Sequence, residues 1–556
     1  MTDRLSIALA QMNPTVGAVT ANRDRIRAAR AEAAARGADL LVCPELALSG
    51  CPPQDLLRTS AFLTQVDQAL RDLAADTADG GPALLVGAPW REQGQLTNAA
   101  LLFDQGAIAA VRLRVSAPDH DDLDESRLFA AGPLPGPVNL RGVRLGLLLG
   151  QDLRNPEVSE TLSESGAEIL VALNAAPFAI DAADERQQAA IARVIESGLP
   201  LLHVNLVGGQ DSWVFDGASF ALEADGRLAA HAPSFAEHLL LTRWERGAND
   251  GWFCHEAETL PPLDGLAAVY GALVLGLRDH VNKGHAPGAL VDLAGDAASA
   301  LVAAIAVDAL GADRVHAVTT PAPDSAPEEL ADAAEIAALL GCRFDTLPIQ
   351  PITRAFDSLL APVFSGRDAE DATDTLHART RGVTLTALAE TIGAVALSTL
   401  TKTDRLIGSP ALVKSLFGGY AVLADAPQSM ALALARWRNA HSPADGRGPA
   451  GRVVPERVLA RSEAIRATPG VNDRDRLPPA DALDALLDRL TGEKPSVGAD
   501  SVPSLGQDAD MVNRVWRLMQ ATEAMRRQSP PGPRITQRTA GHAPRFPLHN
   551  GVTTIA

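Results

Sequence analysis

The sequence predicts an α/β protein of at least two domains, and three observations support this prediction. Its 556 residues are more than a single hydrophobic core supports. Hydrophobic residues make up 46% of the chain and charged residues 21%, which is a composition typical of folded proteins. Short apolar runs alternate with helical patterns, as expected for sheets that are covered by helices.

The first domain is predicted over residues 1–248. Its apolar runs have the length of strands, and the charged, Ala-rich stretch from Asn22 to Arg36 has the composition of a surface helix. A linker is predicted at 249–264, where the string GWFCHEAETLPPLDG follows the last apolar run. The runs assigned to strands are LSIALAQMN, ADLLVCPELALSG, PALLVGAP, AALLF, VRLGLLLG, AEILVALN and PLLHVNLVGG.

The second domain is predicted over residues 265–495 as a parallel α/β unit. An apolar helix to Arg278 ends at the break GHAPG. The strand ALVDLAG, the helix SALVAAIAVDALG and the strand VHAVTT then form a β-loop-α-β unit. Residues 496–556 are predicted as a flexible connection, a helix to Arg527 and a tail rich in Pro and Arg.

Charge and cysteine usage exclude several classes of function. Lys+Arg 49 against Asp+Glu 68 gives a net charge of −19, which argues against a nucleic-acid partner. Four cysteines without a CxxC pair argue against a disulfide framework or a zinc ribbon and favour a reducing, cytoplasmic location. The start MTDRLSIALAQMNP lacks the features of a secretory signal, and no run reaches the ~18 apolar residues of a membrane span. We therefore expect no membrane partner.

Seven local strings follow one another along the chain, namely PEL (44–46), DES (124–126), GGQDSWVFDGAS (208–219), ARTRG (378–382), LARWRNAH (434–441), RDRLPPADALD (474–484) and RRQSPPGPRIT (526–536). Taken together and in this order, they resemble the family of glutamine-dependent NAD⁺ synthetases nearly from end to end. The resemblance implies an N-terminal nitrilase-like α-β-β-α sandwich that releases ammonia from glutamine. It also implies a C-terminal Rossmann-like domain of the adenine nucleotide α-hydrolase type, which adenylates nicotinic acid adenine dinucleotide with ATP and Mg²⁺, and a homo-oligomeric assembly.

The resemblance places an amidase site on three positions, of which only one carries the family's residue. Amide hydrolysis of this type needs a Cys nucleophile, a Glu base and a Lys that stabilises the oxyanion. Glu45 matches the Glu, but Arg114 stands at the Lys position and Gly150 at the Cys position. Glycine cannot form an acyl-enzyme, and Arg cannot lose a proton as Lys can. Glu125, in the DES string, is a candidate for substrate binding.

Other nucleophiles near this site remain as alternatives. Cys43 precedes Glu45 by two residues in the same predicted strand, so the two side chains are expected on one face. Cys51 borders the same pocket, and hydrolysis through either thiol stays open. The opposing interpretation makes Cys43, Cys254 and Cys342 small core residues. Ser116 has no evident base partner.

The expected nucleotide loop also departs from the family's SGGxDS pattern, in which backbone N–H groups hold a pyrophosphate at a helix N-terminus. Asp296 replaces the second glycine, which adds a Cβ and a negative charge where a polyanion would bind. Asp296 could instead cap the helix. A hydroxyl is lost at Ala294 and an Asp at Ala298; the aligned residues are Ala294, Gly295, Asp296, Ala298 and Ser299.

Four further residues are weaker candidates. Lys402 is retained in STLTKTD, where Asp404 could replace a Glu that helps to hold Mg²⁺. Arg379 and Arg381 could bind a dinucleotide phosphate or could serve packing.

The leading hypothesis is a degenerate paralogue, that is, a pseudoenzyme inactive at both sites and acting as a structural or regulatory subunit. It would need no cofactor, and it would form a homo-oligomer or a hetero-oligomer with an active NAD⁺ synthetase paralogue. One alternative is a working NAD⁺ synthetase, a ligase that takes nitrogen from glutamine or ammonia. Another is a small-ligand sensor that uses the altered sites.

Overall fold

The structure is a computed structural model that describes residues 3–92, 94–116, 127–247, 251–321, 325–364, 370–408, 418–443, 445–467, 477–491, 509–536 and 547. These residues divide into two compact units, one ending at Leu263 and the other beginning at Asp264. Among them, no helix is both long and apolar enough to cross a membrane.

The first unit contains two large sheets and a β-hairpin. The seven-stranded sheet has the order β15 (Trp252–Ala257), β14 (His238–Arg246), β1 (Arg4–Gln11), β2 (Leu40–Val42), β3 (Ala83–Glu92), β4 (Gln95–Asp104) and β5 (Ala107–Leu113). The six-stranded sheet has the order β13 (Leu228–His231), β12 (Phe220–Leu222), β9 (Leu201–Asn205), β8 (Ile169–Asn174), β7 (Val143–Leu149) and β6 (Val138–Leu140). The hairpin joins β10 (Val207–Gln210) to β11 (Trp213–Asp216).

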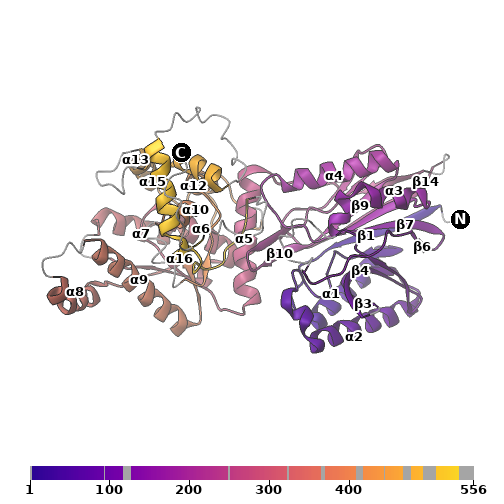
Figure 1. Ribbon diagram of the computed structural model, residues 1–556, viewed down its shortest axis with the longest axis horizontal. Coiled ribbons are helices and arrows are strands. Elements are labelled where there is room, and N and C mark those ends of the chain that lie inside the picture. The colour runs from indigo at the N-terminus through magenta and orange to yellow at the C-terminus, as the bar shows by residue number, and fades with distance from the viewer. Residues whose placement is uncertain are drawn as a thin grey trace. The chain divides into compact units, whose positions relative to one another are not determined.

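Alternation along the strands assembles these sheets into a sandwich. Leu147 and Leu149 of β7 share a core with Leu9 of β1, whereas Leu148 points into a separate core with α3 (Pro156–Glu164) and α4 (Ala182–Ser197). The outer face of the other sheet packs on α1 (Val19–Ala35) and α2 (Ser60–Asp76). Figure 1 shows these helix pairs beside β3 and β4 and beside β7 and β9. The predicted α-β-β-α sandwich is confirmed.

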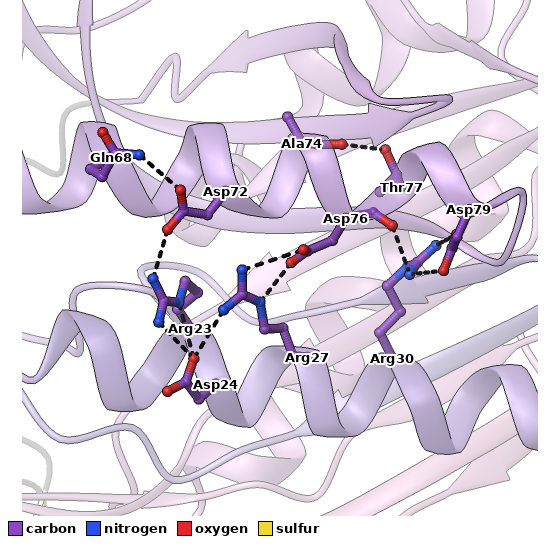
Figure 2. A network of polar contacts seen from close by, with 10 residues as sticks. All are labelled: Arg23, Asp24, Arg27, Arg30, Gln68, Asp72, Ala74, Asp76, Thr77 and Asp79. Atoms are coloured by element: carbon purple, nitrogen blue, oxygen red, sulfur yellow. Dashed lines mark hydrogen bonds and ion pairs between the residues drawn. The ribbon is translucent and has the colours of Figure 1, made fainter.

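The helices α1 and α2 are joined by a ladder of arginine–aspartate pairs (Figure 2). Both rows have the same four-then-three spacing, so each arginine of α1 meets an aspartate of α2 or of the turn that follows it. Arg30 is the most buried of the three, and it also donates to the carbonyls of Asp76 and Pro82. The pairs are Arg23–Asp72 at 2.6 Å, Arg27–Asp76 at 2.6 Å and Arg30–Asp79 at 2.7 Å.

The predicted linker at 249–264 contains a strand. Trp252–Ala257 forms β15, which pairs antiparallel with β14 at the edge of the seven-stranded sheet. The buried indole of Trp252 packs in the core between the sheets, and Arg246 lies 4.8 Å from its ring centroid. Burial of this ring draws the segment into the sheet.

The second unit is built on a five-stranded sheet in which every neighbouring pair is parallel. Its order is β18 (Arg343–Thr346), β17 (Val315–Thr319), β16 (Ala289–Asp292), β19 (Val395–Ser398) and β20 (Tyr420–Ala421). The chain runs from β16 to β17 and β18 on one side and returns to β19 and β20 on the other. Ligands of such sheets bind where this reversal opens a crevice at the carboxyl ends of the strands. The predicted Rossmann-like domain is confirmed.

The helix α6 (Ala297–Leu310), which follows β16, is apolar on nearly all sides and buried at every position except Ala298. Its one internal charge, Asp308, accepts from Arg438 at 2.6 and 3.0 Å and from the hydroxyl of Tyr270 at 2.6 Å. Asp308 therefore holds α6 against α12 (Gln428–Ala440), which carries Arg438, and against α5 (Gly265–Lys283), which carries Tyr270. Burial and the Asp308 charge raise the pKa of Tyr270 well above its ordinary value.

The remaining helices of the second unit are α7 (Pro327–Leu340), α8 (Gln350–Phe364), α9 (Glu370–Ile392), α10 (Lys402–Ile407), α13 (Glu456–Ala467), α14 (Ala480–Thr491), α15 (Ala509–Ala521) and α16 (Glu523–Arg526). The proline-rich segment after α16 docks on β20, where Ala421 N donates to Pro531 O at 2.8 Å. Buried Asp425 accepts from the amides of Ile535 and Thr536 at 2.8 and 2.9 Å. In the described residues, this part of the predicted C-terminal tail belongs to the packed unit.

Candidate functional site

Glu45 lies in a turn after β2 and is almost fully buried. Asn98 of β4 donates to its Oε1 at 2.8 Å, and the amide of Ala175, after β8, donates to its Oε2 at 3.1 Å. Arg114, which follows β5, brings Nη1 to 3.7 Å from Oε1 and is equally buried. The structure thus brings together Glu45 and Arg114, which the resemblance placed in one site, and adds Asn98.

Gly150 completes this group at the end of β7. It begins the short 3₁₀ helix η4 (Gly150–Arg154) with a φ of +51°, a conformation that L side chains rarely adopt. A Cβ built on Gly150 would lie 2.6 Å from Oε1 and 2.7 Å from Oε2 of Glu45. The carboxylate of Glu45 therefore occupies the space into which a side chain at 150 would project.

Asp152 holds the strand end of Gly150 to the segment that follows Arg114. Its buried carboxylate accepts from the amides of Val115 at 3.1 Å and Ser116 at 2.7 Å. Burial raises the pKa of Asp152, and its hydrogen bonds with backbone amides act in the opposite direction. The hydroxyl of Ser116 accepts from Asn155 Nδ2 at 3.2 Å, so it is engaged by an amide group.

Asn98 was not predicted as part of this site, because it contacts Glu45 across 53 positions in the chain and has no local signal. Glu125 lies outside the described residues.

The expectation that Cys43 shares a strand face with Glu45 is wrong. The strand β2 ends at Val42, and Leu46 has a φ of +52°, so Glu45 lies in a turn and the strand alternation does not reach it. Cys43 is buried in the core beneath α1 and α2, and burial raises the pKa of its thiol. Cys51 is buried in the same core.

The two remaining cysteines also have raised pKa values. Burial raises the pKa of Cys254 to about 11, and it raises the pKa of Cys342. None of the four cysteines forms a disulfide.

In the second unit, the expected nucleotide loop follows β16 and leads into α6. Asp296 caps this helix, since its Oδ1 accepts from Ser299 N at 2.8 Å, which is the alternative role that the sequence left open. Its φ of −103° is unstrained, so the expected conflict at positive φ does not arise there. Gly295 carries the positive φ, at +80°, and a Cβ on it would overlap the carbonyl oxygen of Glu329.

This loop does not fit a pyrophosphate. The carboxylate of Asp296 already takes the amide of Ser299, at the helix N-terminus that would otherwise attract a phosphate. The hydroxyl of Ser299 donates to Asp296 O and accepts from Ala294 N, both at 3.2 Å. Ala298 offers only a methyl group. The polar groups of the loop thus bind one another.

The candidate Mg²⁺ ligand Asp404 has a local partner. Its carboxylate accepts from the hydroxyl and the amide of Thr401 at 2.6 and 3.2 Å, which forms a capping box at the start of α10. No group of three or more His, Cys, Asp or Glu in the described part of the chain could hold a metal ion. In the described part of the chain, the residues around Asp404 do not form a metal site of their own.

The other weak candidates are not brought into one site. Buried Lys402 pairs with Asp488 of α14 at 2.9 Å, which ties α10 to α14. Arg379 is exposed on α9, and Arg381 is half-buried two residues later. Residues two apart on a helix do not face the same way, so these two arginines do not form a joint phosphate site.

Asp292 lies at the carboxyl edge of the sheet and was not among the predicted site residues. Asp292, the last residue of β16, is buried and accepts from Thr320 Oγ1 at 3.3 Å. An acidic residue that ends a buried parallel strand is a recognisable signal, because ligands bind at this edge.

Comparisons with known proteins cover both units. A carbon-nitrogen hydrolase family model matches residues 6–247, and an NAD synthase family model matches residues 269–530. The chain is 38% identical to the glutamine-dependent NAD(+) synthetase of Rhodobacter capsulatus, with 99% of each chain covered. It is 34% identical to the protein of the same name from Synechocystis, with 98% of each covered.

Solved structures agree with these relatives. A glutamine-dependent NAD+ synthetase from Acinetobacter baumannii, solved in complex with ADP, superposes with a TM-score of 0.78 at 31% identity over 100% of both chains. A glutamine-dependent NAD(+) synthetase from Cytophaga hutchinsonii, at 17% identity and a TM-score of 0.80 over 98% of both chains, shares the fold. The amidase-like sandwich of the first unit, the parallel sheet of the second unit and the full-length identity with these relatives show that the chain belongs to the family of glutamine-dependent NAD⁺ synthetases.

Proposed function

We propose that this member of the family does not hydrolyse glutamine and serves as a non-catalytic, structural or regulatory subunit. The observation that carries the proposal is the position of Gly150, which has no side chain and whose Cβ position is filled by the carboxylate of Glu45. Covalent amide hydrolysis needs a nucleophile at this point, within reach of the base. Loss of such a nucleophile lowers kcat on the order of 10⁶-fold in other hydrolases.

The rest of the amidase site supports the same proposal. Arg114 keeps a positive charge near Glu45, but its guanidinium stays protonated and has a different shape from an ammonium. The thiols of Cys43 and Cys51 are buried in the core below the site and offer no substitute.

The nucleotide half is proposed to bind ATP weakly or not at all. Asp296 places a carboxylate at the start of α6, where a like-charged phosphate would have to displace it from Ser299 N. In this proposal, the protein's role needs neither ATP nor Mg²⁺.

A second candidate function is a working synthetase, and the comparisons favour it. The relatives that match the whole chain are named as glutamine-dependent NAD(+) synthetases. Asp292 and Thr320 also keep polar groups at the carboxyl edge of the parallel sheet. In this case, free ammonia would bypass the amidase site, and nicotinic acid adenine dinucleotide would be the acid that is amidated.

One assay separates these candidates. Purified protein is incubated with nicotinic acid adenine dinucleotide, ATP and Mg²⁺, with glutamine or ammonium as the nitrogen donor, and NAD⁺ and glutamate are measured. The Rhodobacter capsulatus relative serves as the positive control, and a Gly150→Cys/Arg114→Lys variant is run alongside. The proposal expects no product with either donor. Formation of NAD⁺ from ammonium alone would establish a working synthetase that uses free ammonia. Release of glutamate by the wild-type chain would overturn the proposal that the amidase site is inactive because Gly150 supplies no nucleophile.

A structural or regulatory subunit acts through a partner protein. We propose that this partner is an active NAD⁺ synthetase paralogue, with which the chain forms a hetero-oligomer. Shared family membership supports this choice, because similar folds present similar surfaces. Co-expression of the tagged chain with an untagged active paralogue tests it. The expected result is co-purification that survives a salt wash, and separate elution would count against the hetero-oligomer.

A further inference from the structure

The loop between β16 and α6 is bound by an arginine from a distant part of the chain. Arg461 of α13 donates from Nη2 to the carbonyl oxygen of Gly295 at 2.7 Å, across 166 positions in the sequence. Gly295 is buried, and its Cα lies against the carbonyl oxygen of Glu329 in the first turn of α7. The loop therefore lies against α7 and is held there by α13.

The guanidinium of Arg461 is anchored on a buried aspartate. Its Nη1 lies 2.7 Å from Oδ2 of Asp332 on α7, and Asp332 is 1% exposed. Arg457, one turn earlier on α13, brings Nε to 2.6 Å from Oδ1 of the same carboxylate. Because a buried charge that loses a partner is costly, Asp332 keeps both arginines in place. One arm of Arg461 is thus fixed on α7 while another binds the loop.

The charges of this group are balanced. Arg457 also pairs with Glu335, so two arginines of α13 face two carboxylates of α7. The flat fork of a guanidinium can serve two acceptors at once, which an ammonium cannot do in the same geometry. Arg461 therefore acts on the loop as a fixed hydrogen-bond donor.

The contact of Arg461 acts together with the hydrogen bonds inside the loop. Ala294 N donates to the hydroxyl of Ser299 at 3.2 Å, and Ser299 N donates to Asp296 at 2.8 Å. A loop that holds a pyrophosphate presents such amides to the ligand. Gly295 lies between them in the chain, so a movement that turns these amides toward a ligand also moves the carbonyl that Arg461 holds.

We propose that Arg461, anchored on Asp332, is an internal latch that keeps the loop after β16 closed whether or not a nucleotide is present. This inference rests on the proposed function and deepens it, because a subunit that acts without ATP then has a nucleotide half of constant conformation. The latch is an autoinhibitory contact: a nucleotide has to break it before the loop can bind a phosphate.

The first test is amide hydrogen exchange of the full chain, read at Ala294 and Ser299. Arg461→Ala should speed the exchange of both amides at least about tenfold, because opening the loop no longer breaks a charge-assisted hydrogen bond. The matched control is Arg436→Ala, which removes two ion pairs between α12 and the same helix α13 and should exchange as wild type. Unchanged exchange in Arg461→Ala, or an equal increase in the control, would overturn the inference.

A second variant separates the latch from general stability. Arg461→Lys keeps the positive charge near Asp332 but lacks the fork, so its exchange at Ala294 and Ser299 should lie between wild type and Arg461→Ala. The amides of β17, the neighbouring strand, should exchange as in wild type in both variants. An increase of the same size in β17 would make Arg461 a general stabiliser and would overturn the latch.

The third measurement adds millimolar ADP to the wild-type chain. A loop that is closed from within should show the same exchange at Ala294 and Ser299 with and without ADP. Slower exchange with ADP would show that the loop responds to nucleotide, and it would overturn the inference. The proposed function is decided separately, since NAD⁺ formation by the wild-type chain would overturn it whatever these two amides do.

Discussion

The backbone of Gly150 lies against the carboxylate of Glu45 so closely that a Cβ on Gly150 would come within 2.6 Å of Oε1. Asn98 and the amide of Ala175 hold the carboxylate in this place. A nucleophile can therefore be restored at position 150 only if Glu45 moves. In this site, the carboxylate of Glu45 packs directly against the backbone of Gly150.

A methyl group at position 150 should destabilise the protein. Gly150→Ala is expected to lower the free energy of unfolding by about 2–3 kcal/mol, because it combines strain at positive φ with displacement of Glu45. The matched control is Gly37→Ala, where φ is +77° but no atom lies within 4 Å of the new Cβ, and a loss of about 1 kcal/mol is expected. Urea denaturation measures both, and equal losses would contradict the role of Glu45.

Arg30 of the arginine ladder should contribute more to stability than an exposed arginine of the same helix. Arg30→Ala is expected to cost about 2–3 kcal/mol, because Arg30 is buried and its loss removes the ion pair with Asp79 and the donor that Arg30 supplies to the carbonyl of Pro82. Arg25→Ala, which removes a half-exposed pair with Glu237, should cost less than about 0.5 kcal/mol. Thermal and urea unfolding of both variants checks the order.

His203 should make the stability of the first unit depend on pH. Burial and the charge of Arg186 lower the pKa of His203 to about 3, and Asn174 contacts its Nε2 at 3.1 Å. Between about pH 6.5 and pH 3 the unfolded chain binds a proton that the folded chain does not, so stability is complete above this window and falls as the pH drops. The expected contribution is a loss of about 2 kcal/mol at pH 5 relative to pH 7.

The control for this prediction is His203→Gln, which keeps a polar group near Asn174 and removes the titration. Its urea midpoint should change less than that of the wild-type protein between pH 7 and pH 5. An unchanged pH dependence would place the titration elsewhere, and His231, whose pKa burial also lowers, would be the next residue to substitute.

Asp296 should act as a cap more than as a ligand residue. Asp296→Ala is expected to cost about 1 kcal/mol of stability, and Asp296→Asn only a few tenths, since Asn caps as well as Asp. If the carboxylate is what repels phosphate, Asp296→Asn should also bind ADP more tightly than the wild-type chain in calorimetry. Unchanged weak binding would assign the misfit to the remaining changes in the loop.

The layers of the fold could be predicted from the sequence because most strands and helices have a recognisable pattern of apolar residues of their own. The runs VRLGLLLG and AEILVALN became β7 and β8, and the helix after ALVDLAG became α6. The strand β15 was missed, because an edge strand next to Pro and Gly has no strong pattern of its own and is held by one buried tryptophan.

The positions of the site were located by the resemblance, but their contacts were not. Asn98 and Glu45 lie 53 residues apart, and Lys402 and Asp488 lie 86 apart. Pairings between distant elements have no local signal, so the ion pair by which Lys402 joins α10 to α14 could not be predicted from the sequence. The turn at Glu45 was read as strand because its apolar neighbours continue the pattern of β2.

The ion pair between Arg438 and Asp308 has a bearing on ancestry. Arg438 belongs to the string LARWRNAH, one of those by which the chain is recognised, and its guanidinium donates to Asp308 of α6 and to the carbonyls of Pro449 and Gly451. Selection for a folded protein is enough to preserve such a string, whether or not a substrate is ever turned over. A sequence string of this kind can therefore identify a family member whether or not that member has kept the family's reaction.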